Sequence, residues 1–131
     1  MGEKDIEKLR QQQLSAYYHI AISYARLEKW ERSLWPFTRC IQIDPSEPKY
    51  QMERGKVYQA LQLFDEAIED FNSVVKENPK NAHAFFRRAF AYKATKEFEK
   101  AAEDFERARK LDPLNKKLVV SHKHLKNVNY L

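Results

Sequence analysis

Three prolines recur along the chain at one fixed interval. Pro45, Pro79 and Pro113 stand 34 residues apart, and each closes a short polar step (IDP, ENP or LDP) after a run of helix-forming residues. Proline lacks a backbone N–H and clashes with the preceding helical turn, so these positions predict three equivalent helix stops. A period of this size is typical of a helical repeat array.

The composition supports a single helical domain over residues 1–131. The chain is 43% hydrophobic and 33% charged, and it contains only two glycines, Gly2 and Gly55. Such a low glycine content argues against a sheet protein with many tight turns and against a phosphate-binding loop. Cys40 is the only cysteine, which excludes an internal disulfide and favours a reducing compartment.

The first residues, MGEKDIEKLR, are charged and lack the apolar segment of a secretory signal. No apolar run in the chain reaches the roughly 20 residues that span a bilayer. We therefore expect an intracellular, cytoplasmic protein or a fragment of one, with no membrane partner. The sequence does not determine the oligomeric state, and a monomer is favoured.

Aligning the prolines places the rest of the chain in columns. Small residues share one column (Ala21, Gly55, Ala89), and a phenylalanine recurs in another (Phe37, Phe71, Phe105). Each unit is expected to hold two amphipathic helices of about 13 residues that bury their apolar faces by stacking. We divide the chain into a helical extension (1–13), three repeats (14–47, 48–81 and 82–115) and a capping helix (116–131).

These columns resemble the tetratricopeptide repeat pattern W-x2-L-G-x2-Y, A-x3-F and P. The second unit reads QMERGKVY, AIEDF and P, the third FFRRAFAY, AAEDF and P, and the first YYHIAISY, SLWPF and P. The match covers residues 14–113 without insertions. The resemblance implies an all-α, right-handed superhelical solenoid that serves as a protein-interaction scaffold, with no catalysis and no cofactor.

In this family the first helices of successive repeats line a concave groove for an extended peptide or a partner's helix. Helical geometry predicts the groove side chains here. Cations outnumber acids among them, and the apolar Ile22, Phe86 and Phe90 are expected to be exposed, which favours an acidic partner segment with apolar anchors. The candidate partner-binding residues are Tyr18, His19, Ile22, Arg26, Lys49, Met52, Glu53, Lys56, Gln59, His83, Phe86, Arg87, Phe90 and Lys93.

One subclass of the family binds the acidic C-terminal tails of heat-shock chaperones. The resemblance implies that its carboxylate clamp uses Lys and Asn in the first helix, Asn in the third, and Lys and Arg in the fifth. The matching positions here are Tyr18, Ile22, Glu53, His83 and Arg87. Only Arg87 fits the clamp, and Glu53 would repel a carboxylate, so we do not expect a chaperone-tail adaptor.

The sharpest departure from the pattern is Trp35-Pro36, where the other units have Glu69-Asp70 and Glu103-Asp104. We expect these acidic pairs on the solvated face of the second helices. Trp35 and Pro36 then form a local kink with Trp35 folded onto the N-terminal extension, a second contact surface, or a surface that an N-terminal continuation of the parent protein covers. Arg54 and Arg88 are expected to cover the seam with their stems and to place their charges in water.

Two alternatives to groove binding remain open. The chain could be an architectural segment of a larger repeat protein, or it could bind an acidic surface or nucleic acid. Residues 107–126 carry seven of the basic side chains against Asp112 alone, although no nucleic-acid recognition motif is present. No metal site is expected, because His122 and His124 would face different sides of a helix.

Overall fold

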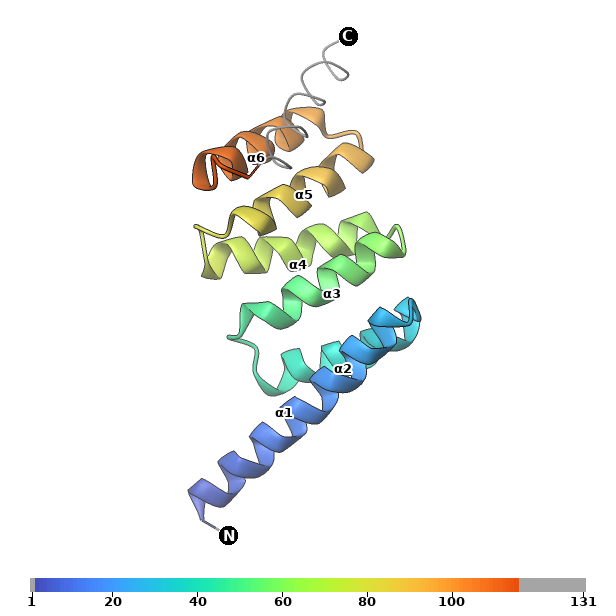
Figure 1. Ribbon diagram of the computed structural model, residues 1–131, viewed down its shortest axis with the longest axis vertical. Coiled ribbons are helices and arrows are strands. Elements are labelled where there is room, and N and C mark those ends of the chain that lie inside the picture. The colour runs from blue at the N-terminus through green and yellow to red at the C-terminus, as the bar shows by residue number, and fades with distance from the viewer. Residues whose placement is uncertain (1, 116–131) are drawn as a thin grey trace.

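The computed structural model describes residues 2–115 as an all-α solenoid. The helices stack in chain order along the long axis of the molecule, with α1 at one end and α6 at the other (Figure 1). No strand occurs in this part of the chain. The predicted fold class is confirmed, and the expected capping helix (116–131) lies outside the described residues. The helices are α1 (Glu3–Arg26), α2 (Trp30–Ile43), α3 (Pro48–Ala60), α4 (Phe64–Glu77), α5 (Ala82–Ala94) and α6 (Phe98–Leu111).

The helix ends follow local chemistry. Pro45, Pro79 and Pro113 each stand two residues after the last residue of a second helix, as the repeat period predicts. The next helix then begins with a side-chain cap, because Glu47 accepts from the Lys49 N–H and Asn81 accepts from the Ala84 N–H. These turns bring successive helix pairs side by side.

Within each repeat, the turn after the first helix contains a residue with a left-handed backbone. Glu28, Gln62 and Lys96 have φ of 58°, 61° and 65°, and they occupy the same column. The following N–H bonds back across the turn in each repeat, as from Lys29 to the Tyr24 carbonyl at 2.9 Å. This is a Schellman closure built without glycine.

The core is a ladder of phenylalanines facing small residues. Phe37, Phe71 and Phe105 are all almost completely buried, and Ala21 and Ala89 are fully buried opposite them. Gly55 occupies the same column, where an added Cβ would lie 2.6 Å from the Phe71 ring. Small residues therefore let the paired helices approach closely enough to enclose the rings.

The expectation that the acidic pairs face water is wrong for Asp70 and Asp104. Both are buried, and each accepts two hydrogen bonds from an arginine of the preceding helix. Arg54 binds Asp70 with Nε–Oδ2 at 2.8 Å and Nη2–Oδ1 at 2.7 Å. The arginine heads thus lie in the seam rather than in water, because a buried carboxylate needs a charged, bidentate donor.

The same columns in the first repeat hold an apolar pair. Ile20 stands where Arg54 and Arg88 stand, and Pro36 stands where Asp70 and Asp104 stand. Pro36 is fully buried inside α2, which continues through it to Ile43. Without an arginine to pair, a carboxylate at position 36 would be buried alone, so the apolar pair replaces the ionic one as a unit.

Candidate functional site

A groove of about 1100 Å³ lies along the first helices of the three repeats. Helices α1, α3 and α5 provide nearly all of its walls, and Trp30 at the start of α2 adds one aromatic side chain. Because every first helix presents the same face, a partner segment could contact all three repeats at once. The groove is lined by Tyr18, His19, Ile22, Ser23, Ala25, Arg26, Trp30, Glu53, Lys56, Val57, Gln59, Ala60, Phe86, Arg87 and Phe90.

The groove carries an excess of positive charge. Its charged side chains are three cations, Arg26, Lys56 and Arg87, and one carboxylate, Glu53. Lys56 Nζ lies 3.2 Å from Glu53 Oε1, so the single carboxylate is neutralised internally. Arg26 and Arg87 remain to balance negative charge on a ligand.

Arg87 of α5 is held in place in the groove by Gln59 of α3. The Gln59 amide donates to the Arg87 carbonyl at 2.9 Å, and Arg87 Nη1 donates to Gln59 Oε1 at 3.4 Å. Burial lowers the pKa of Arg87, while the nearby Glu53 carboxylate acts in the opposite direction. A partly desolvated guanidinium of this kind gains strongly from a carboxylate ligand.

Aromatic rings form the two ends of the groove. Tyr18 packs edge-on against Phe37 and Tyr50, and burial raises the pKa of the Tyr18 hydroxyl. At the other end, Phe90 meets Phe86 edge-on with ring centroids 5.0 Å apart, and it also meets Phe105. These contacts fix the orientation of the rings that a ligand would touch.

Comparison with known proteins agrees with this architecture. The family model for the tetratricopeptide repeat matches residues 52–116. The chain belongs to the tetratricopeptide repeat family. No curated protein has a matching sequence.

Solved tetratricopeptide repeat domains superimpose closely on this chain. The first such domain of Spaghetti (RPAP3), bound to the HSP90 peptide SRMEEVD, is 24% identical over 92% of this chain and 95% of its own, with a TM-score of 0.86. The Arabidopsis OM64 domain is 23% identical over 91% and 98%, with a TM-score of 0.85. The second domain of human RPAP3, in complex with the HSP70 peptide SGPTIEEVD, is 25% identical over 89% and 98%, with a TM-score of 0.83.

The structure brings ten of the fourteen predicted groove residues together in this tetratricopeptide groove and places four elsewhere. Met52 belongs to the buried core, and His83 stacks on Phe86. Lys49 lies over the Tyr18 and Tyr50 rings, with Nζ 4.9 Å and 5.5 Å from their centroids. Lys93 does not line the groove.

Of the three apolar side chains expected to be exposed, Ile22 is half-buried against the core and Phe86 is buried. Phe86 is only 3% exposed, because it packs into the core against Phe105, whereas Phe90 is 39% exposed and presents its ring to the groove. The column of Phe86 and Met52 faces the boundary between core and groove, so a long side chain there turns inward.

Sequence reasoning missed Ser23, Val57 and Trp30 as groove residues. Trp30 is partly buried and packs against the core cluster of Ala21, Phe37 and Val57. As the first residue of α2, it stands beside the C-terminal end of α1 and reaches the groove mouth. Its position directly after an interhelical turn is the signal that could have identified it.

The second candidate surface, Trp35 and Pro36, is split by the structure. Pro36 is buried, whereas Trp35 is 53% exposed and meets Tyr17 of α1 edge-on at 5.9 Å.

Within the described residues, no helix is long and apolar enough to cross a membrane, and no cluster of His, Cys, Asp or Glu has the arrangement of a metal site.

Proposed function

We propose that this domain is a non-catalytic interaction scaffold that binds a partner segment carrying acidic and apolar residues. The observation that carries the proposal is the groove itself, whose cations Arg26 and Arg87 lie between aromatic ends. Structural relatives bound to HSP90 and HSP70 peptides support a peptide ligand. Acidic groups would be attracted to the cations, and apolar side chains would fix the register against Tyr18 and Phe90.

The partner segment differs from the chaperone tails in those complexes. Of the five clamp positions, Tyr18, Ile22 and Glu53 place two apolar groups and a carboxylate where amide and ammonium donors are needed. Loss of charged donors, each contributing about 1.5–3 kcal/mol, would weaken a bound terminal carboxylate severely. We propose instead that internal acidic residues of the ligand meet Arg87 and Arg26.

A selection from a displayed library of random peptides tests this proposal directly. Enriched peptides should combine Asp or Glu with an aromatic or aliphatic residue. Lys56→Glu with Arg87→Glu should abolish their binding without unfolding the protein. The matched control is Lys76→Glu with Lys80→Glu, which reverses two exposed charges outside the groove and should leave affinity unchanged.

Two results would contradict the groove assignment. One is the enrichment of peptides without acidic residues, and the other is equal binding to the groove variant and to wild type. The peptide SRMEEVD, added as a separate probe, should bind no better than a scrambled sequence. Tight binding of that peptide would overturn the distinction from the chaperone-tail adaptors.

The alternative of nucleic-acid or acidic-surface binding rests on the basic stretch 107–126, most of which lies outside the described residues. Within the described part, Arg107 lies over the Phe85 ring at 5.2 Å, and Arg109 Nε donates to Glu106 at 3.1 Å. Both cations are engaged with their own chain.

An architectural role in a larger protein is favoured by one observation, the exposure of Trp35.

A further inference from the structure

The first repeat presents an apolar surface at the end of the solenoid. In the interior, α3 contacts α2 through the Arg54–Thr38 bond at 3.1 Å, and α5 contacts α4 through the Arg88–Asn72 bond at 2.9 Å. In the described part of the chain, no helix packs against the corresponding face of α1. That face nevertheless carries Ile20, 39% exposed, in the column of the two arginines. An end exposed to water would be expected to carry polar groups.

The apolar end surface continues along the N-terminal part of α1. Ile6 is 57% exposed and Leu9 is 47% exposed. Together with later residues of α1 and its C-cap residue Leu27, they follow a spacing of alternating three and four, which is the heptad pattern of a helix that packs against another helix. We call this row the α1 stripe: Ile6, Leu9, Gln13, Ala16, Ile20, Ser23 and Leu27.

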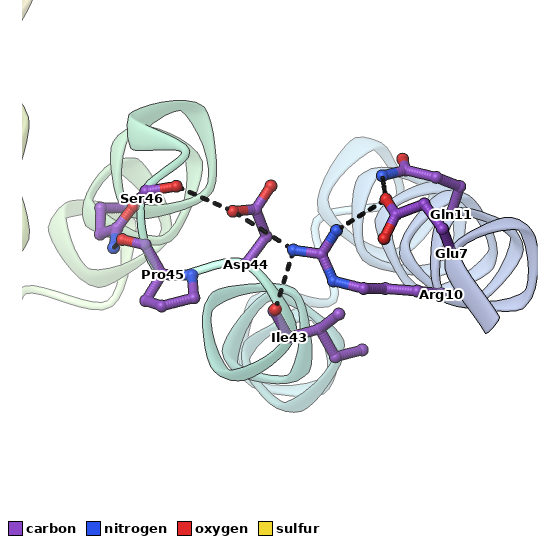
Figure 2. Close-up of polar contacts among 8 residues, drawn as sticks. Glu7, Arg10, Gln11, Ile43, Asp44, Pro45 and Ser46 are labelled. Atoms are coloured by element: carbon purple, nitrogen blue, oxygen red, sulfur yellow. Dashed lines mark hydrogen bonds and ion pairs between the residues drawn. The ribbon is translucent and has the colours of Figure 1, made fainter. Parts of the chain in front are cut away.

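The N-terminal part of α1 is held in helical form by contacts with α2. Figure 2 shows Arg10 reaching from α1 to the C-terminal end of α2, where Nη2 donates to the Ile43 carbonyl at 3.2 Å and lies 3.7 Å from Asp44. Arg10 Nη1 also binds Glu7 at 3.0 Å. Its positive charge interacts favourably with the carbonyl end of the α2 dipole, and the contact ties the N-terminal part of α1 to the first repeat.

Because α1 is one continuous helix, the surface at this end differs from an ordinary junction between two repeats. Residues 44–47 and 78–81 connect one repeat to the next, whereas the equivalent residues 10–13 are helical. A preceding repeat in the same register would need its connecting turn where α1 already runs straight. The stripe therefore requires a different occupant from the second helix of an in-phase repeat.

We propose that the occupant is the α1 stripe of a second copy of this chain, packed antiparallel about a twofold axis. In heptad register, Leu9 of one copy lies opposite Ile20 of the other, and Gln13 lies opposite Ala16. Small side chains at Ala16 and Ser23 allow close approach. The same register places Asp5 beside Arg26 of the second copy, so the flanking charges are complementary. Arg26 lies where the stripe borders the groove, so in the dimer Arg87 is the groove cation that stays available to a ligand.

Mass measurement of the full chain by sedimentation equilibrium over a wide concentration range tests the proposal. The wild type should reach the mass of two chains. Leu9→Lys with Ile20→Lys should raise the dissociation constant by about 100-fold or more, because four charges would enter an apolar seam. Gln11→Lys with Ser15→Lys is the matched control, since it adds the same charge to exposed positions of α1 outside the stripe.

Disulfide trapping tests the orientation. Mixing Leu9→Cys chains with Ile20→Cys chains should give a cross-linked heterodimer, while each variant alone should cross-link poorly. Cys40 is fully buried and does not compete. A single-chain mass at every concentration, or a dimer unaffected by the Leu9 and Ile20 substitutions, would overturn the proposal. Efficient Leu9–Leu9 linkage would overturn the antiparallel arrangement.

Discussion

Arg88 donates two parallel hydrogen bonds to Asp104, with Nε–Oδ2 at 2.6 Å and Nη2–Oδ1 at 2.8 Å. The third guanidinium nitrogen, Nη1, donates to Asn72 at 2.9 Å. One side chain therefore joins α4, α5 and α6, and its hydrogen bonds to Asp104 raise the pKa of Arg88. Arg54 repeats the arrangement with Asp70 and Thr38.

The first prediction concerns this pair. Arg88→Leu should lower the free energy of unfolding by about 3–5 kcal/mol, because it leaves the Asp104 carboxylate buried without a cation. Arg88→Leu combined with Asp104→Leu should recover most of that loss. Urea denaturation of the two single variants and the double variant measures the coupling. Additive losses in the double variant would show that the pair does not act as a unit.

The repeat period predicted the fold and the faces of the helices, but it did not predict the ionic seam. A column of arginines, taken by itself, predicts side chains that face water, because Lys and Arg are mostly exposed in proteins. The informative signal was pairing between columns: Arg54 occurs with Asp70, Arg88 with Asp104, and Ile20 with Pro36. Such joint replacement within one chain indicates contact across the helix pair.

The groove was predicted in part for a similar reason. The period correctly predicted that Ile22, Lys56 and Phe90 face the groove, because they occupy equivalent positions on the three first helices. It could not decide how far a long side chain at a boundary column turns inward. Phe86 turns toward Phe105 because the space above Ala101 and Ala108 admits a ring. That outcome depends on packing volumes rather than on periodicity.

A second prediction concerns Gly55, at the centre of α3. Alanine is the better helix former by about 1 kcal/mol, so propensity alone would make Gly55→Ala stabilising. The added Cβ would lie 2.6 Å from Phe71 Cε1, and that ring is fully buried. We expect a net loss of about 1–2 kcal/mol from overpacking. Gly55→Ala combined with Phe71→Leu should relieve the clash, and a stabilised single variant in thermal denaturation would refute the reasoning.

A third prediction concerns the left-handed residue in the turn after α5. Lys96 has φ of 65° and donates its N–H to the Lys93 carbonyl at 3.0 Å. A side chain in this conformation costs about 1–2 kcal/mol, which glycine does not incur. Glycine also has greater conformational entropy in the unfolded chain, which offsets part of this difference. Lys96→Gly should therefore raise the free energy of unfolding by about 0.5 kcal/mol. Lys96→Val should destabilise, and the reverse order of melting temperatures would contradict the turn assignment.

A fourth prediction converts the groove toward the chaperone-tail clamp. Ile22→Asn, Glu53→Asn and His83→Lys, beside the existing Arg87, bring four of the five clamp positions to the side chains that the resemblance implies and leave Tyr18 unchanged. The triple variant should bind SRMEEVD, and an amidated C-terminus on the peptide should remove most of that affinity, because the clamp recognises a terminal carboxylate. Fluorescence anisotropy with labelled peptide measures both. Equal binding by wild type and variant would show that these positions do not determine ligand choice.

The last prediction concerns Cys40, which is fully buried with its Sγ 3.8 Å from the Leu14 carbonyl. Burial raises the pKa of the Cys40 thiol from 9.0 to about 11. Above pH 9 the unfolded thiol loses its proton while the folded one keeps it, so folding stability should fall as the pH rises from 9 to 11. Cys40→Ala should remove this part of the pH dependence in parallel urea titrations. At pH 8, a thiol-specific reagent should react only as fast as the chain unfolds, and rapid labelling of the native protein would show that Cys40 is accessible.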